Sequence, residues 1–176
     1  GGAGSGTFEA YAGRHVTVNT GVTLTPGTSG DVYLHAAGSN ILGTGVVTMN
    51  GTLDFSTSGD AFFVSGLDAS GNRTQDITIS NTLLNYATTF NGLSLSGFRD
   101  VTVARNLSMT SGITLTAERN LTVNSGAVIT PTGAGAVTLK AAGGVVTNTG
   151  QLFLNGNVNM GTGIYTLTGG GGCLWQ

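Results

Sequence analysis

Acidic and basic side chains that could act together on a substrate are spaced along the middle of the chain. Asp60, Asp76 and Asp100 each precede an alternating apolar segment, and Arg99 and Arg105 lie close to the last of them. Carboxylates gathered on one face can act as a general acid and base or bind calcium, and a converging arginine offers a base for elimination chemistry. Such chemistry requires these side chains to meet in one place.

The spacing of the acidic residues favours a structural role instead. Counted from Asp31, successive members are separated by 29, 16 and 24 residues, which fits a single column only loosely. Asn106, Asn120 and Gln151 occupy equivalent positions before other apolar segments, and an amide cannot replace a catalytic carboxylate. Side-chain oxygens at such positions accept hydrogen bonds from local backbone N–H groups at corners. We therefore expect corner residues here and no catalytic residue.

The residues that bind transition metals are few and scattered. His15 and His35 are the two histidines, Cys173 is the single cysteine, and none has an acidic partner at ligand spacing. The acidic segment from Asp68 to Asp76 lacks the spacing of an EF-hand loop. The sequence predicts no metal site and no cofactor.

Two aromatic residues stand at positions where a strand would point them outward. Tyr33 is the middle residue of Val32-Tyr33-Leu34, and Phe153 is the middle residue of Leu152-Phe153-Leu154. An exposed aromatic ring can stack on a sugar ring or on a neighbouring filament. Tyr33 and Phe153 are therefore the predicted binding residues.

The elements that would position all these side chains are short alternating segments. An apolar residue, a hydroxyl residue and another apolar residue recur, followed by a small or polar corner, and period-two alternation of this kind is typical of a strand with one buried face. These triplets are Val16–Val18, Val22–Leu24, Ile77–Ile79, Leu93–Leu95, Val101–Val103, Leu107–Met109, Ile113–Leu115, Leu121–Val123 and Val137–Leu139.

The distances between triplets suggest a coiled wall. Leu93 to Ile113 and Val101 to Leu121 are each twenty residues, Val137 to Val158 is twenty-one, and Val16 to Val32 and Leu121 to Val137 are sixteen. Coils of about 20 residues predict an all-β, single-stranded parallel β-helix (a β-solenoid) of roughly eight or nine coils. Three-residue corners could also close hairpins, so an antiparallel sandwich stays open as the alternative.

Two regions interrupt this rhythm. Residues 65–76 hold several charges and no triplet, which predicts a loop protruding from a shaft that spans residues 1–168. Residues 169–176 form a glycine-rich tail or a continuation into further coils. Neither end has the polar cap that a solenoid needs, so end-to-end stacking or continuation in a longer parent chain is expected.

Composition limits the function classes. The chain has 176 residues, 39% hydrophobic and 8% charged, with 31 glycines and a net charge of −2. Six Lys and Arg cannot supply the cation cluster of a nucleic-acid binder, and no apolar run is long enough for a membrane helix. There is no signal-peptide pattern, and the missing initiator Met suggests a mature or excised piece.

Several segments resemble the coils of filamentous haemagglutinin and of related two-partner-secreted exoproteins and autotransporter passengers. The segments are 100–109, 113–123 and 136–144, and the resemblance is clearest from Asp76 to Leu167. It implies a right-handed β-helix, export to a bacterial cell surface, and roles in adhesion, biofilm or contact-dependent competition. That family has no shared catalytic residues in these coils, so none is carried over.

The expected function is a non-enzymatic, rigid β-solenoid shaft in a secreted or surface-exported bacterial adhesin or filament. Its expected partners are itself, adjacent coils of a longer parent chain, and host or cell-surface glycans, without nucleic acid or membrane insertion. One alternative is a carbohydrate-active β-helix enzyme, a polysaccharide lyase or hydrolase. The other is an ice- or surface-binding array of Thr-x-Thr pairs, at Thr114/Thr116, Thr130/Thr132, Thr147/Thr149 and Thr166/Thr168.

Overall fold

The computed structural model describes residues 6–27, 30–55, 59–86, 88–142 and 150–170, together with the backbone of residues 173–175. This part of the chain is made of short strands and one turn of 3-10 helix at Ala37–Ser39. Thr147 and Thr149, which the sequence assigned to a Thr array, lie outside the described residues.

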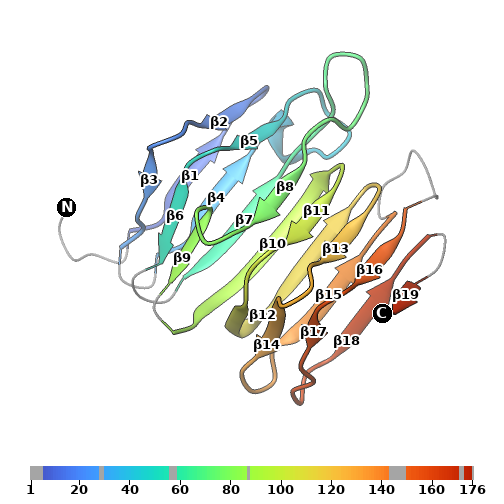
Figure 1. The fold of residues 1–176 in the computed structure, drawn as a ribbon. Coiled ribbons are helices and arrows are strands. Elements are labelled where there is room, and N and C mark those ends of the chain that lie inside the picture. Colours follow the sequence, from blue (N-terminus) through green and yellow to red (C-terminus); the bar gives the residue numbers. More distant parts are fainter. Residues whose placement is uncertain are drawn as a thin grey trace.

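The strands fall into three groups, which we call the long face, the second face and the third face (Figure 1). The long face contains β1 (Phe8–Tyr11), β4 (Val32–His35), β7 (Asp60–Val64), β10 (Phe90–Phe98), β12 (Leu107–Ala117), β15 (Ala136–Lys140) and β18 (Tyr165–Thr168). The second face contains β2 (Val16–Val18), β5 (Val47–Met49), β8 (Ile77–Ile79), β11 (Val101–Val103), β13 (Leu121–Val123), β16 (Leu152–Leu154) and β19 (Cys173–Trp175). The third face contains β3 (Thr23–Leu24), β6 (Thr52–Phe55) and β9 (Leu84–Tyr86), and further along the stack β14 (Val128–Pro131) and β17 (Asn157–Val158).

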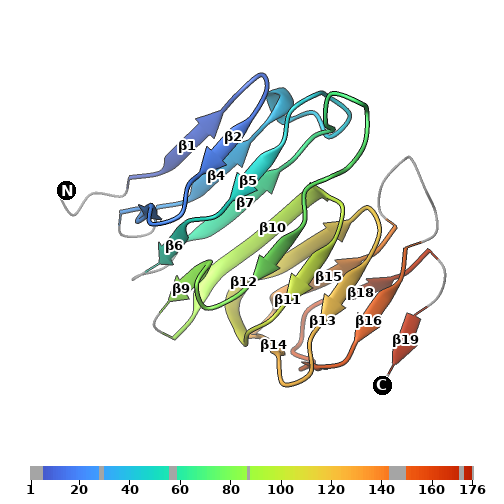
Figure 2. The ribbon, with the colours of Figure 1, turned by 45° about the horizontal axis from the view of Figure 1, so that its top comes forward.

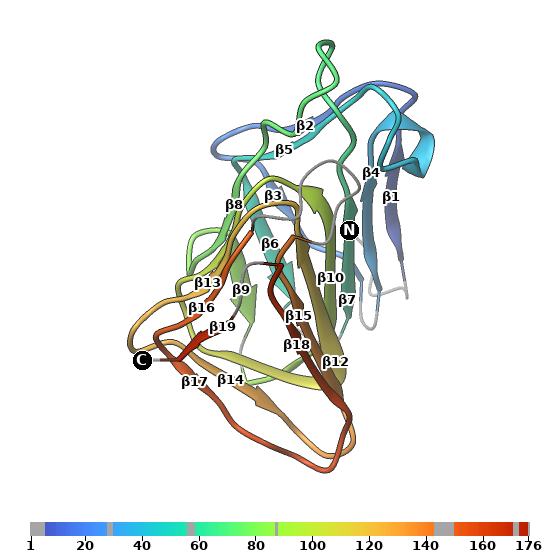
Figure 3. The same ribbon diagram turned by 90° about the vertical axis from the view of Figure 1, so that its right-hand side faces the viewer.

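Within the described residues, every strand pairs with its neighbours in parallel. Each parallel neighbour comes from the previous or the next winding of the chain, so the faces stack into a β-solenoid. Figure 3 shows the windings enclosing a narrow interior, and in Figure 2 the two termini lie at opposite ends of the stack. The predicted all-β solenoid is confirmed, and the antiparallel sandwich is excluded.

The windings differ in length from the expected twenty residues. The twenty-residue returns from Leu93 to Ile113 and from Val101 to Leu121 are true pairings. Elsewhere on the long face, paired residues lie between 24 and 32 residues apart. The long face contains six successive pairings, from β1 to β18, so eight or nine coils are not found.

The other predicted returns do not describe pairings. Val16 pairs with Val47 and not with Val32, since Val32 belongs to the next face that the chain reaches. Leu121 pairs with Leu152, and Val137 pairs with Tyr165. Triplets on different faces look alike, so subtracting their numbers does not identify the pairs that stack.

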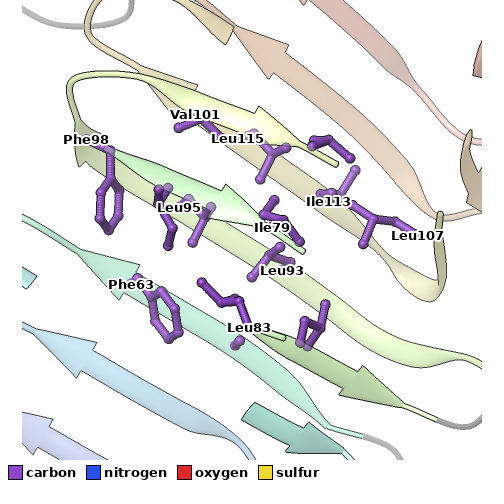
Figure 4. Packing of buried hydrophobic residues seen from close by; sticks show 14 of the residues in the cluster. Phe63, Ile79, Leu83, Leu93, Leu95, Phe98, Val101, Leu107, Ile113 and Leu115 are labelled. Atoms are coloured by element: carbon purple, nitrogen blue, oxygen red, sulfur yellow. The ribbon is translucent and has the colours of Figure 1, made fainter. Parts of the chain in front are cut away.

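The interior is formed by the apolar residues of the alternating segments. Val101, Val103, Leu121 and Val123 are fully buried, whereas the threonines between them are only half-buried. Figure 4 shows Leu93, Leu95, Ile113 and Leu115 projecting into one contiguous core between the faces, beside Phe63 and Phe98. Burial of stacked aliphatic and aromatic side chains is the main stabilising term for the solenoid.

The second face has one interruption along the stack. β2 and β5 form a two-stranded sheet, and β8 begins a separate five-stranded sheet. Between them the hydroxyl of Ser65, a fully buried residue, accepts a hydrogen bond from the Val47 N–H at 3.1 Å. This hydroxyl replaces a partner that a continuous ladder would supply. The chain between β7 and β8 extends away from the coil as a loop (Figure 3).

Candidate functional site

The structure divides the acidic residues between two corners of the solenoid. At the first corner, the N–H of Asp60 donates to Oδ1 of Asp31 at 3.0 Å. At the second corner, the N–H of Asp100 donates to Oδ1 of Asp76 at 3.2 Å. The predicted corner role is correct, but each side-chain oxygen accepts from the next winding and not from local backbone. The separations of 29 and 24 residues are therefore each one winding at one corner.

The second corner continues as a ladder of side-chain oxygens along the stack. Oδ1 of Asp100 accepts the N–H of Asn120 at 3.0 Å, and Oδ1 of Asn120 accepts the N–H of Gln151 at 3.1 Å. An amide and a carboxylate perform this task equally well, because each presents an oxygen to the backbone N–H of the winding above. This explains why Asp and Asn alternate at these positions.

Two arginines add ion pairs to this ladder. Nε of Arg99 donates to Asp76 at 2.8 Å, and Nε of Arg119 donates to Asp100 at 2.9 Å, with a second guanidinium contact in each pair. Partial burial alone would raise the pKa of Asp100. The hydrogen bonds from Arg119 and from the Asn120 N–H, with the charges of Arg119 and Arg99, outweigh burial, so the pKa is lowered from its ordinary value.

The carboxyl group of Asp60 at the first corner is shifted in the opposite direction. Burial, and then the charge of Asp31, raise its pKa, while a hydrogen bond with Asn91 opposes the shift. The folded state therefore favours the protonated form of Asp60 and the ionised form of Asp100. The two corners contribute opposite pH dependences to stability.

The pH dependence of unfolding should separate the two corners. A lowered folded-state pKa gives stability that is present above the unfolded-state pKa and lost as pH falls, so Asp100→Asn should remove stability selectively at neutral pH. A raised folded-state pKa gives stability that is present in acid and lost as pH rises, so Asp60→Asn should remove a contribution selectively below about pH 4. Urea unfolding measured between about pH 2 and 7 tests both variants. Parallel profiles for the two variants would contradict this assignment.

The five groups considered for catalysis do not meet at one site. Asp60 lies at the first corner and Asp76, Arg99 and Asp100 at the second. Arg105 lies elsewhere, with its guanidinium 4.3 Å from the centre of the Tyr86 ring and its Nε donating to the Asn106 carbonyl at 3.0 Å. The acid–base arrangement that the sequence raised as a possibility is therefore not assembled by these residues.

The predicted binding residue Tyr33 lies in an outward-facing aromatic cluster on the long face. Its ring stacks on Phe62 of the next winding, with centroids 4.8 Å apart and planes inclined by 8°. His35 contacts Tyr11 edge-on at 4.7 Å and Tyr33 at 5.9 Å. His35 Nδ1 is 2.8 Å from the Ser39 hydroxyl, and its pKa is lowered by burial against the opposing charge of Glu9. The cluster places aromatic surface beside carboxylates.

A groove of about 300 Å³ adjoins this cluster on the long face. Asp60 and Phe62 line it from β7, and successive windings add small residues. Its lining is Asp60, Phe62, Gly92, Leu93, Ser94, Ser111, Gly112, Ile113, Thr114 and Ala136. A side chain at Gly92 would place its Cβ 2.7 Å from the Gly112 carbonyl oxygen and 2.8 Å from Oδ1 of Asp60, so glycine keeps the floor open.

The other predicted surface residues lie apart from this groove. Phe153 points outward from β16 on the second face, in register with Thr122. Of the Thr array, Thr114 and Thr166 do share the long face, with Thr138 between them in register. Thr130 lies on β14 of the third face, so the expected Thr-x-Thr pairs do not form one regular array.

The histidines are separated, and the described residues contain no group of three or more His, Cys, Asp or Glu that could hold a metal. His15 accepts the Val46 N–H through Nδ1 at 3.2 Å, far from His35 in the fold's connectivity. Asp68 accepts the N–H groups of Ser70 and Asn72 at 2.9 and 2.8 Å, which closes the tip of the loop after β7. No helix in the described ranges is long and apolar enough to cross a membrane.

A buried ion pair was missed by sequence reasoning. Nε of Arg73 lies 3.5 Å from Oε2 of Glu118, with side-chain exposures of 3% and 7%. The guanidinium also donates to the carbonyls of Ser65 and Gly97 at 3.4 and 3.3 Å. The pair fastens the end of the loop after β7 to β10 and to the segment that follows β12. The only signal in the sequence was an unusual pair of charges in a chain with few of them.

Comparisons with protein-family models, curated proteins and solved structures find no match to this chain. Function must therefore be inferred from the solenoid, its corners, its ends and the groove.

Proposed function

We propose that this chain is a rigid, non-enzymatic shaft segment of a bacterial surface-exported adhesin or filament, and that its ends pair with further coils or with another copy. The resemblance of its coils to filamentous haemagglutinin supports the extracellular setting. It also supports a right-handed winding, the hand that parallel crossover connections adopt in nearly all cases.

The observation that carries the proposal is the open end of the stack at β1. Phe8 is in register with Val32, which is completely buried, yet Phe8 is 41% exposed. β1 pairs on one side with β4, and the described residues contain no strand on its other side. An exposed strand edge with an apolar side chain in register is a template for a further winding.

The other end of the stack has the same character. On β18, Tyr165 and Leu167 continue the inward positions of Val137 and Leu139. Val137 and Leu139 are fully buried, but Tyr165 and Leu167 remain partly exposed. Two open ends of matching composition allow coils to be added along one axis, which is what a shaft requires.

The interior of the stack supports rigidity. Corner ladders join each winding to the next, and the core contains large side chains that are almost completely buried, among them Phe55, Phe63, Phe90 and Phe98. Packing at interior density resists compression and bending, so the stack can transmit position from one end to the other.

Substitution of Phe8 by Lys should weaken end-to-end association while leaving the fold intact. A lysine at this position places a charge where the next winding would have to bury it, and strand edges are commonly protected by lysine in this way. Thr7→Lys adds the same charge one residue earlier and is the matched control. Sedimentation velocity over a concentration series, with electron microscopy of the assembled fraction, measures the effect.

The expected result is longer assemblies for the unaltered chain and Thr7→Lys than for Phe8→Lys. A chain that stays monomeric at all concentrations, with no filament on attachment to flanking coils, would contradict the shaft proposal. Equal assembly by both lysine variants would show that the β1 end is not the contact.

A further inference from the structure

We propose that the groove on the long face between Phe62 and Thr114 is a binding site for a neutral saccharide, with Phe62 as the stacking platform and Asp60 as the hydroxyl acceptor. The shaft function does not depend on this site. The argument uses the shape of the groove, the ring that bounds it, and the charges around it.

The shape of the groove follows from the register of four windings. Asp60, Gly92, Gly112 and Ala136 occupy one position on successive strands, and the neighbouring outward position is occupied by Phe62, Ser94 and Thr114. A large side chain at the start of both rows is thus followed by small ones. The resulting hollow of about 300 Å³ is of the size of small-molecule sites and runs along the axis of the stack (Figure 1).

The aromatic ring presents its free side to this hollow. Tyr33 covers Phe62 on the side of β4 through the parallel stack at 4.8 Å, and Tyr33 does not line the groove. On the side of β10 the next residue in register is Ser94, which is too small to cover the ring. Because Tyr33 fixes its orientation, Phe62 offers a preorganised apolar face to a ring with axial C–H groups.

The polar groups of the groove are acceptors and hydroxyls. Asp60 contributes a carboxylate, and Ser94, Ser111 and Thr114 contribute hydroxyl groups, while the lining contains no Lys or Arg. Asp31 at the same corner adds a second negative charge, because it accepts the Asp60 N–H. Hydroxyl donors of a neutral sugar suit this surface, whereas a sulfate or uronate would be repelled.

The open form of the groove suits one or more units of a chain. Ser94 and Thr114 continue in register to Thr138 and Thr166, so a row of hydroxyl side chains extends beyond the groove along the long face. An oligosaccharide that runs along this row would stack one unit on Phe62 and place the others beside hydroxyl groups. A platform on a shaft could hold a glycan chain parallel to the axis.

The test is a binding assay with neutral and acidic oligosaccharides of equal length. Cellohexaose, maltohexaose and mannohexaose are the neutral probes, and heparin hexasaccharide and hexagalacturonate are the acidic probes. Binding is measured by NMR titration and calorimetry on the unaltered chain and on Phe62→Leu, Asp60→Asn and Ser94→Trp. Phe153→Leu is the matched control, because it removes an outward aromatic from the middle of a strand on the second face.

We expect binding of at least one neutral probe, weakened about tenfold by Phe62→Leu and unchanged by Phe153→Leu. Ser94→Trp should abolish binding by filling the hollow, and it keeps the inference testable if Phe62→Leu unfolds. Binding of acidic probes only, binding unaffected by Phe62→Leu and Ser94→Trp, or no binding to any neutral probe would overturn the inference. A monomeric chain that binds the sugar would separate this result from the shaft proposal.

Discussion

Substitution of Arg73 by Met is expected to lower the free energy of unfolding by about 3–5 kcal/mol. Methionine retains most of the packing of the side-chain stem, but it leaves the nearly buried carboxylate of Glu118 without the guanidinium 3.5 Å away. The carbonyls of Ser65 and Gly97 lose the same donor. Urea unfolding followed by far-UV circular dichroism measures the loss.

Two further variants distinguish a buried pair from a generic charge effect. Arg99→Met removes an arginine from an exposed pair with Asp76, and solvent screening makes its expected effect far smaller. Arg73→Met combined with Glu118→Gln should recover part of the loss, since no uncompensated charge then remains inside. Equal destabilisation by Arg73→Met and Arg99→Met would show that the buried pair has no special role.

Substitution of Gly97 by Ala is expected to destabilise the fold by more than about 4 kcal/mol. Gly97 has a φ of +77°, and a Cβ built on it would overlap the carbonyl oxygen of Ser65 and lie 3.2 Å from Nη1 of Arg73. Backbone on both sides prevents relief by a rotamer change. The substitution therefore forces β10 away from the segment that ends β7.

Gly126 provides the matched control for conformation without contact. Its φ is +82°, and a Cβ there would meet nothing within 4 Å. Gly126→Ala should cost only the left-handed backbone penalty, about 1–2 kcal/mol. The difference between the two midpoints in urea then measures the close approach of windings at Gly97, and similar midpoints would contradict it.

The alternating triplets predicted the strands well because their period is local. Each triplet became a strand or part of one, and its two apolar residues turned inward, as at Val101 and Val103. The length of a winding was predictable only where corners stay short. It failed between Val137 and Tyr165, because the number of residues in a corner leaves no mark on the strands that it joins.

The candidate site was less predictable, since it depends on register between windings. The outward position of Tyr33 follows from its own triplet, but its stacking on Phe62 requires knowledge that β4 pairs with β7. Likewise, Arg73 and Glu118 are 45 residues apart and carry no shared motif. The acidic spacings contained the winding lengths at two corners, but one corner was interleaved with the other.

Parallel pairing throughout the described residues has a consequence for how the molecule acquires its structure. No strand has a hairpin partner, and even the nearest pairing on the long face joins residues twenty positions apart. Closing such a loop must precede any gain from backbone pairing, so the first contact between two turns is expected to be the slow event. Once it exists, its edge templates the following turn, and order spreads outward one layer at a time.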